Sequence, residues 1–425
     1  MVEQGMNAAG GLREEASPHL TSSTHEMTSK DQIVILIGLN ALYIGFGMVM
    51  GMVNGGLPTV MRAQGVGIGA AGWLYILYLP FGLTFLWAPL IDRLKLPFLS
   101  HRLGWIVCMQ ILAAFILLIV GFMEGLALWG LFGLGLSIAF AIATMDIALD
   151  ALAVQCVRSD WRPIAAATKL SALSVGVMIG GGAFVALFQT LGWQTIFSLM
   201  VGVLVLLLIP ALFLKKYDVQ AQKTIVTIKQ SKASLFQLLR QGKTRNRLLL
   251  LVFICCVIFP LAGLNRLMLI DIGVSVEKIG WIVGTLGPLS MLATSVLSVP
   301  LMRFQGLLKS AYLFLVLTFI AVAALLYGFY HLHMTIAVMG TVLTGAGISG
   351  IYIVVTSKII GWSVGTQPAT DYAVYYGLGR FTSTLMTVGA AQIIPFLGWG
   401  MFYSLGVFGL LAVLFILYNL IGNKE

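Results

Sequence analysis

The sequence predicts an all-α integral membrane protein with twelve transmembrane helices, arranged as two six-helix pseudo-repeats. Three observations carry this prediction. Hydrophobic residues make up 59% of the 425 residues and charged residues only 9%, with a mean hydropathy of +1.00, whereas about a quarter of the residues in a soluble protein are charged. The apolar residues form runs of membrane-spanning length, and the second half of the chain repeats landmarks of the first. Hydrocarbon, rather than water, is therefore the expected solvent.

Twelve apolar segments follow a polar N-terminal stretch. Residues 1–30 are rich in Ser, Thr, Glu and Gly and have no apolar core of signal-peptide length, so we expect a disordered cytoplasmic tail. Each later segment is close to the roughly 20 residues that cross about 30 Å of hydrocarbon. The segments are expected near 33–56, 71–91, 103–122, 125–149, 164–189, 193–214, 247–270, 279–302, 309–330, 334–357, 371–395 and 398–421.

The placement of Lys and Arg predicts the orientation. Alternate loops hold 21 of these residues on the side of both termini and three, Arg62, Arg266 and Lys278, on the other side, and Arg380 remains inside a helix. Basic loops stay in the cytoplasm, so both termini are expected there, in a multi-pass protein of the bacterial inner membrane. The net charge of +10 is thus a topology signal. Because no DNA-reading motif accompanies it, we expect no nucleic-acid partner.

A basic loop divides the chain into two halves. Residues 31–214 are expected to form the first six-helix half, 215–246 a cytoplasmic linker and 247–425 the second half. The charge of the linker either anchors the topology or binds anionic lipid head groups. Parallel halves are typical of transporters that rock around a site between them. The repeat pairs Gly65, Gly72 and Trp73 with Gly273, Gly280 and Trp281 at an offset of 208, and Leu191-Gly192-Trp193 with Leu397-Gly398-Trp399 at an offset of 206.

Two carboxylates near the end of the fourth segment are functional candidates. Asp146 and Asp150 are one helical turn apart and therefore share a face. Carboxylates at membrane depth are costly unless they face a cavity, find a cation or take up a proton, and two on one face favour protonation of at least one. We expect proton coupling at this pair. The alternative is that the helix ends earlier and both groups pair with Arg158, Arg162 or Lys169 at the cytoplasmic surface.

The eleventh segment combines aromatic, acidic and cationic residues. Arg380 lies ten residues inside an apolar span, where it needs a carboxylate or an anionic ligand. The alternative is an exposed helix start with the side chain extended to the interface. An aromatic and cationic wall would suit a conjugated or acidic solute. The residues expected to line a substrate cavity are Arg380, Asp371, Tyr372, Tyr375, Tyr376, Asn54 and Arg266.

Other functional classes lack their signatures in the sequence. No nucleophile, base and orienting group are recognisable as in an enzyme, and no phosphate-binding loop for ATP is present, so neither catalysis nor a cofactor is expected. His331 and His333 have no third ligand nearby, and the four cysteines lack zinc or disulfide spacing, so we expect no metal site. The expected partners are a small-molecule solute, protons and membrane lipid.

The turn between the second and third segments resembles the loop signature of the major facilitator superfamily. It reads Trp87-Ala-Pro-Leu-Ile-Asp92-Arg93, followed by His101-Arg102. The resemblance implies a cytoplasmic gate in which Asp92 pairs with basic residues such as Arg93 and Arg102 and releases them when the halves rock. The corresponding turn near Arg303 and Lys309 lacks the acidic residue, and a plain topology anchor explains the arginines equally well.

Several elements together resemble the AmpG-related branch of this superfamily. That branch includes muropeptide permeases, acetyl-coenzyme A transporters and siderophore-associated transporters of the RhtX, FptX and YbtX type. Muropeptide permeases tend to have Gln at the position of Asp371, and in this respect the chain is more similar to the siderophore-associated group. The resemblance implies proton-driven import of a siderophore or metal-siderophore complex from periplasm to cytoplasm, with Asp146 and Asp150 in the acidic motif of the branch. A muropeptide permease and an exporter of a small organic solute are the alternatives. The resembling elements are Gly56-Leu57-Pro58, the run from Phe85 to Arg93, the run from Asp146 to Ala151, and Ala369-Thr370-Asp371-Tyr372-Ala373.

Overall fold

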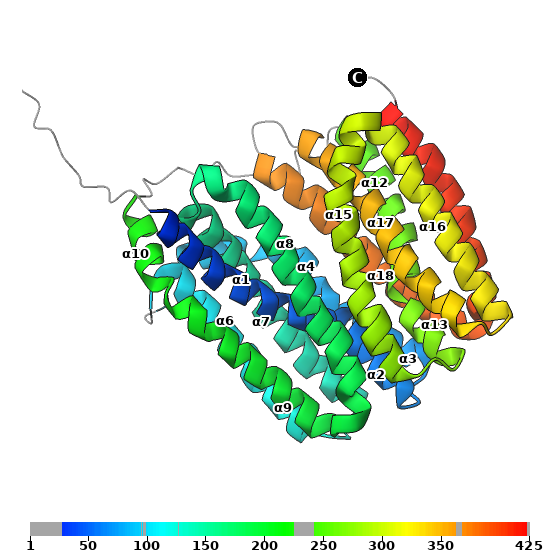
Figure 1. The fold of residues 1–425 in the computed structure, drawn as a ribbon, viewed down its shortest axis with the longest axis horizontal. Helices are drawn as coiled ribbons and strands as arrows, with labels where there is room; N and C mark the ends of the chain where they lie inside the picture. The colour runs from blue at the N-terminus through cyan, green and yellow to red at the C-terminus, as the bar shows by residue number, and fades with distance from the viewer. Residues whose placement is uncertain are drawn as a thin grey trace, which may run out of the picture.

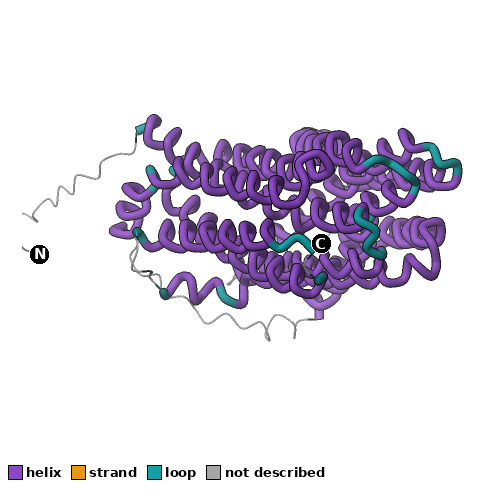
Figure 2. The backbone as a smooth tube through the Cα atoms, turned by 90° about the horizontal axis from the view of Figure 1, so that it is seen from below, coloured by secondary structure: helices purple, strands orange, loops and turns teal. Residues whose placement is uncertain are grey.

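The computed structural model describes residues 28–94, 96, 99–125, 127–224, 242–362 and 368–422, and every regular element in these ranges is helical. Figure 2 shows the helices joined by short loops. The predicted tail lies outside the described residues except for positions 28–30, and so does the linker from 225 to 241. Helices are the expected elements in hydrocarbon because they satisfy their backbone hydrogen bonds internally.

The helices follow one another in two groups. The first group consists of α1 (Ser29–Gly51), η1 (Met52–Gly56), α2 (Leu57–Ala63), α3 (Ile68–Trp73), η2 (Leu74–Tyr78), α4 (Leu79–Leu83), η3 (Thr84–Leu86), α5 (Ala88–Arg93), α6 (His101–Phe122), α7 (Leu128–Cys156), η4 (Ser159–Trp161), α8 (Arg162–Met178), η5 (Ile179–Ala183) and α9 (Phe184–Leu212). After α10 (Lys215–Thr224), the second group consists of α12 (Gly242–Gly263), α13 (Asn265–Asp271), α14 (Val276–Lys278), η6 (Ile279–Val283), α15 (Gly284–Gln305), α16 (Leu307–Tyr330), α17 (Met334–Trp362), α18 (Pro368–Leu417) and η7 (Tyr418–Gly422). The turns η1, η5, η6 and η7 are π-helical, and η2, η3 and η4 are 3₁₀-helical.

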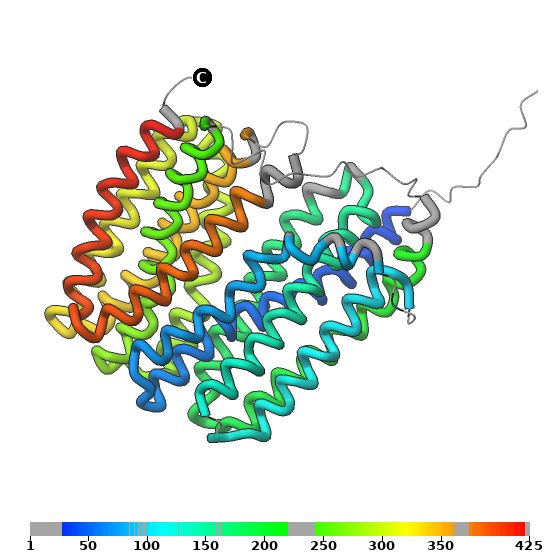
Figure 3. The backbone as a smooth tube through the Cα atoms, turned by 180° about the vertical axis from the view of Figure 1, so that it is seen from behind, coloured from blue at the N-terminus to red at the C-terminus, as the bar shows by residue number. Residues whose placement is uncertain are grey.

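Nine helical runs in the described part of the chain are long and apolar enough to cross a membrane. Two of them turn back on themselves, at Gly192 with φ 73° in α9 and at Gly398 with φ 77° in α18. Glycine adopts positive φ without the steric cost of a Cβ atom, and Figure 3 shows α18 folding back from orange to red. Together with the broken helical run over 68–93, these turns are consistent with the twelve predicted passes.

Each half packs around an apolar core of its own. One cluster of buried residues comes from 35–217 and takes in Val276, and the other comes from 248–420 and takes in Tyr75. Figure 1 shows the two halves side by side, one blue to green and the other yellow-green to red. Large apolar side chains such as Phe304, 91% exposed, and Phe396, 88% exposed, lie outside both cores. Such exposure is unfavourable in water and carries no such cost against lipid tails.

The predicted internal repeat is visible in the backbone. Gly72 and Gly280 each lie in contact with the opposite half of the protein. An added Cβ would lie 2.3 Å from Ala391 Cβ at the first position and 2.3 Å from the Ala186 backbone nitrogen at the second. Only glycine permits these two close approaches between the halves. The paired positions that share positive φ are Gly65 with Gly273 and Gly192 with Gly398.

The helix that carries the two candidate carboxylates is longer than predicted. The sequence predicts its end near 149, but α7 continues to Cys156. Leu152 and Cys156 are still buried in the first apolar core, so the extra turns gain packing. The alternative in which this helix ends before the carboxylates is therefore wrong, and Asp146 and Asp150 both lie within α7.

The first part of the predicted linker forms the docked helix α10. Its Asp218 is fully buried, and the carboxylate accepts hydrogen bonds from the backbone N–H groups of Arg102 and Leu103, each at 3.0 Å. These groups belong to the N-terminus of α6, where the helix leaves N–H donors unpaired and favours negative charge. The Tyr217 hydroxyl donates to Asp31 Oδ1 at 2.7 Å. Burial, helped by this bond, raises the pKa of Tyr217 to about 12.

Candidate solute-binding site

A cavity of about 310 Å³ lies between the two halves. The first half contributes α1, η1, η2 and α8, and the second contributes α12, α13, η6, α15, α17 and α18. Among the described residues that line it, Arg266 and Arg380 are charged, and neither Asp nor Glu occurs. The wall of the cavity is therefore cationic. Its other polar residues are Asn54, Tyr75, Tyr78, Thr341, Ser349, Tyr352, Ser383, Thr384 and Thr387.

Arg380 of α18 is held by aromatic residues from both halves. Its Nη1 donates a hydrogen bond to the Tyr78 hydroxyl of η2. The guanidinium carbon lies 5.2 Å from the ring centroid of Tyr78 and 4.9 Å from that of Tyr376, which is cation–π geometry. The Nε atom is buried and has no hydrogen-bond partner. A buried donor left unpaired costs about 1–3 kcal/mol, so this group would gain from an acceptor supplied by a ligand.

Arg266 reaches across from the second half to the backbone of the first. The helix breaks at Leu264, between α12 and α13, and Arg266 is the second residue of α13. Its Nη1 donates to the Gly181 carbonyl in η5. A Cβ atom added at Gly55 in η1 would lie 2.8 Å from Arg266 Nη1, so glycine at this position leaves the room that the guanidinium occupies.

The other predicted cavity residues divide into three groups. Asn54 lines the cavity and is exposed to it. Tyr376 contacts Arg380, whereas Tyr375 is buried in the core of the second half, with its ring 5.7 Å from that of Trp362. Tyr375 therefore faces the core instead of the cavity, because consecutive helical residues point about 100° apart. Asp371 and Tyr372 lie in the first turn of α18, and their side chains lie outside the described part of the structure.

The two carboxylates of α7 have different surroundings. Asp150 Oδ1 accepts a hydrogen bond from the Tyr43 hydroxyl at 2.6 Å and forms an ion pair with Lys169 Nζ at 2.5 Å. Lys169 Nζ also lies 4.6 Å from the ring centroid of Tyr43. Asp146 Oδ1 is buried without a hydrogen-bond partner. Pairing with Lys169 is one alternative that the sequence leaves open. Asp150 makes this pair, whereas Oδ1 of Asp146 does not.

Arg158, another basic residue considered for these carboxylates, lies in the turn after α7. Arg158 Nε donates to Asp160 Oδ1 at 2.8 Å, and its Nη2 pairs with Asp160 Oδ2. The Arg158 guanidinium beside Asp160 holds the pKa of that carboxyl below its usual value. The side chain of Arg162 lies outside the described part of the structure. Arg158 therefore pairs with a carboxylate of the turn after α7.

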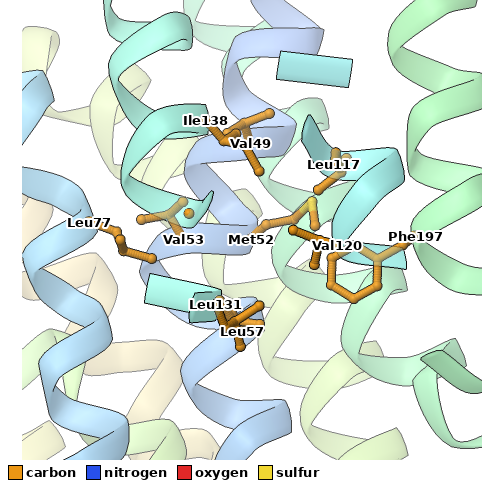
Figure 4. Close-up of a pocket in the computed structure, with 11 residues that line it drawn as sticks. Val49, Met52, Val53, Leu57, Leu77, Leu117, Val120, Leu131, Ile138 and Phe197 are labelled. Atoms are coloured by element: carbon orange, nitrogen blue, oxygen red, sulfur yellow. The ribbon is translucent and has the colours of Figure 1, made fainter. Parts of the chain in front are cut away.

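Two further cavities lie within the first half. One of about 380 Å³ is lined by Asn40, Tyr43, Asp150 and Lys169 together with apolar residues of α1, α7 and α8. The other, shown in Figure 4, has about 30 Å³ and an entirely apolar lining. This volume matches about one water molecule, so we regard it as a packing gap in the core. The larger cavity, in contrast, has room for water beside the Asp150–Lys169 pair.

The predicted cytoplasmic gate is only partly described. Asp92 and Arg93 end α5, and their side chains lie outside the described part. Arg102 lies in the first turn of α6, where its backbone N–H donates to Asp218. The gate role of these three residues stays a prediction.

Besides the bonds of Arg266 and Arg380 at the cavity, three contacts join the halves toward the helix ends opposite this gate. Arg62 Nη2 lies 2.7 Å from Asp271 Oδ1, Gln392 Nε2 donates to the Gly69 carbonyl at 2.6 Å, and the Tyr75 hydroxyl donates to the Gly263 carbonyl at 2.7 Å. Each of these bonds joins one half to the other, so this face is closed.

Sequence reasoning missed several of these residues. Tyr43, Tyr78 and Tyr352 carry no sequence signal, because tyrosines are common at membrane interfaces. Arg62 and Asp271 each look like an ordinary loop charge. Only the packing of the halves brings them together.

The cavity between two pseudo-repeated helical halves agrees with a family match. The model of the Major Facilitator Superfamily matches residues 39–269, more than half of the chain. The chain belongs to the Major Facilitator Superfamily. Membership in this superfamily makes it a multi-pass membrane transporter and not an enzyme.

Relatives of this superfamily member include AmpG proteins. It is 27% identical over 282 residues to the anhydromuropeptide permease of Escherichia coli K12, a match that covers 64% of this chain and 57% of the permease. The chain thus spans less than two thirds of that relative. It is 22% identical over 390 residues to putative transporter AmpG 4 of Rickettsia conorii, covering 88% of this chain and 93% of that one. These matches support the AmpG-related branch, and the finer siderophore-associated assignment stays a prediction.

Solved structures support the fold. A bacterial homologue of the iron transporter ferroportin in an inward-facing state has a TM-score of 0.64 at 15% identity, covering 92% of this chain and 98% of that one. A bacterial homologue of the lysosomal transporter Spinster, inward-facing and unoccupied, has a TM-score of 0.56 at 15% identity, covering 93% and 96%. At this identity the likeness concerns the fold alone.

Proposed function

We propose that this superfamily member imports an anhydromuropeptide-class solute across the bacterial inner membrane, driven by protons. The observation that carries the proposal is the cavity between the halves, whose described lining has two arginines and no carboxylate. A solute made of sugar and peptide offers carboxylates for the arginines and hydroxyl or amide groups for the surrounding Tyr, Ser and Thr residues. The AmpG names of the relatives support the same solute class.

The muropeptide, an alternative in the sequence analysis, takes the place of the siderophore as the main proposal. The siderophore prediction depends on Asp371, whose side chain lies outside the described residues. No contact in the described cavity favours a metal chelate over an acidic glycopeptide. The muropeptide has the support of the relatives' names, so we place it first.

Asp146 is the proposed site of proton coupling. Its Oδ1 is buried without a partner, while Asp150 is paired with Lys169 and Tyr43. A buried carboxylate is stabilised either by a partner or by taking up a proton. Asp146 also interacts electrostatically with Arg380 in the cavity wall and with Lys169. Charge changes at the solute site and at this carboxylate therefore influence one another, as coupled transport requires.

The direction of access follows from the closed face. We take the face that carries Arg62 and Asp271 as periplasmic, in line with the positive-inside rule. The bonds between the halves at that face support an inward-facing state of the cavity. Rocking of the halves would break these bonds and open the cavity to the periplasm.

A comparison of the uptake of two solutes tests the proposal. Cells that lack their own muropeptide uptake and express this chain would receive a labelled anhydromuropeptide or a labelled ferric siderophore, each with and without a protonophore. Protonophore-sensitive accumulation of the muropeptide above an empty-vector control is the expected result. Accumulation of the siderophore alone would overturn the muropeptide proposal in favour of siderophore import. Uptake of neither solute would overturn both import proposals.

A further inference from the structure

Two π-helical turns of the first half form a cradle of glycines beside the solute cavity. The turn η1 contains Gly55 and the turn η5 contains Gly181, and the two turns are in contact. The approach is at backbone level, since a Cβ added at Gly56 would lie 2.6 Å from the Gly180 carbonyl oxygen. Single π-helical turns interrupt the regular hydrogen-bond ladder of a helix and recur at functional sites.

The guanidinium of Arg266 fills this cradle from the other half. It donates to the Gly181 carbonyl, and an added Cβ at Gly55 would lie 2.8 Å from Nη1, 3.0 Å from Cζ and 3.2 Å from Nε. The described lining of the cavity contains no carboxylate that could pair with this cation. A neutral carbonyl is a weaker partner for a guanidinium than an anion, because charge-assisted hydrogen bonds are about twice as strong as neutral ones.

We propose that Arg266 exchanges between two partners during transport, the Gly181 carbonyl in the empty inward-facing state and a carboxylate of the solute in the loaded state. The Gly181 carbonyl then competes with the carboxylate of the solute for the guanidinium, and this competition assists release of the solute. The same bond ties the halves together while the cavity is empty. We call this bond between Arg266 and the Gly181 carbonyl the tie. The exchange of partners rests on the proposed function, whereas the tie does not.

The geometry places this tie where opening would break it. Arg266 belongs to α13, which ends at Asp271, the partner of Arg62 at the closed face. Gly181 belongs to the other half. Separation of the halves at that face therefore pulls the guanidinium out of the glycine cradle. Loss of the tie should shift the empty protein toward the state that is open at this face.

The tie is tested first, without any solute. Spin labels on unnatural amino acids at Gln64 and Glu277, both exposed at the closed face, would report the distance between the halves by pulsed electron resonance in nanodiscs and leave the native cysteines in place. Gly55→Ala and Arg266→Gln should both raise the long-distance population severalfold. Gly202→Ala is the matched control, since a Cβ there meets no atom within 4 Å. Unchanged distances in both variants, with the protein folded, would overturn the tie.

The exchange is tested by binding of a labelled anhydromuropeptide and of the same compound with its carboxylates amidated. Arg266→Gln should weaken binding of the acidic form at least tenfold and leave the amidated form nearly unchanged. Gly55→Ala, which displaces the guanidinium from the Gly181 carbonyl, should increase the affinity for the acidic form and slow its release. Equal losses for both compounds in Arg266→Gln would overturn the exchange. Failure of the unsubstituted protein to bind the acidic probe would overturn the proposed function and the exchange together, while the tie is decided separately by the distances.

Discussion

Arg62 and Asp271 form an ion pair between the two halves, with 2.7 Å between Arg62 Nη2 and Asp271 Oδ1. The second carboxylate oxygen of Asp271 accepts a hydrogen bond from Trp399 Nε1, also at 2.7 Å. Trp399 follows Gly398, the positive-φ turn of α18, so the turn places the indole on the carboxylate. The pair lies at the closed face, and a cycle of alternating access must break it.

Removal of this ion pair should favour the state that is open at the periplasmic face. The side chains are 24% and 16% exposed, so we expect a shift of about 0.5–1 kcal/mol in the conformational equilibrium for Asp271→Asn, at the upper end of values for exposed pairs. Labelling of a cysteine introduced at Asn54, in the cavity wall, with a membrane-impermeant maleimide added on the periplasmic side should become two- to fivefold faster. The exchange of charges in Arg62→Asp/Asp271→Arg should restore part of the original rate. Unchanged labelling in Asp271→Asn would show that the pair does not hold the gate.

Asp146→Asn should abolish uptake driven by a proton gradient while the protein remains in the membrane. The substitution keeps the size of the side chain and removes the titratable group, whose Oδ1 has no partner to lose. Solute exchange without a gradient should persist, because binding and rocking do not need the carboxylate. Counterflow and gradient-driven uptake in proteoliposomes separate the two properties. Full gradient-driven uptake by Asp146→Asn, by Asp150→Asn and by the double variant would remove the coupling role from this pair.

Asp150→Asn should act mainly on stability. The change leaves Lys169, 31% exposed, without its carboxylate, and an unpaired cation at membrane depth is unfavourable. Because both side chains are partly exposed, we expect a loss of about 1 kcal/mol, visible as a lower melting temperature in detergent. The double variant Asp150→Asn/Lys169→Gln should recover most of this loss. A double variant that is no more stable than Asp150→Asn would contradict a pairwise role.

Arg380→Gln should weaken binding of the acidic solute by about tenfold or more, since it removes a partly buried cation from the cavity wall. Tyr78→Phe removes one hydrogen bond but keeps the ring, and we expect a loss of about threefold, equivalent to about 0.7 kcal/mol. Tyr375→Phe is a suitable control because this side chain faces the core. Calorimetric or fluorescence titration of purified protein gives the dissociation constants. Equal affinities for the Arg380 variant and the control would exclude Arg380 from the site.

The residues of the site were predictable to different degrees. Arg266, Arg380 and Asn54 stand out in the sequence as polar residues within apolar spans, and all three line the cavity. Tyr375 and Tyr376 are adjacent in sequence and could not be told apart, because their roles depend on which face of α18 meets the second core. Tyr78 carries no mark in the sequence, and only the approach of η2 to α18 makes it a partner of Arg380.

The sequence by itself determined the helical membrane fold and the repeat. Hydrocarbon requires long apolar helices with internally paired backbones, and the positive φ values of Gly65, Gly192, Gly273 and Gly398 are local properties that a repeated glycine reveals. The tertiary structure alone decided the partners: Lys169 for Asp150, Gly181 for Arg266 and Asp271 for Arg62. These pairs join different helices, and their formation depends on how the helices pack. Spacing along a single segment therefore cannot specify them.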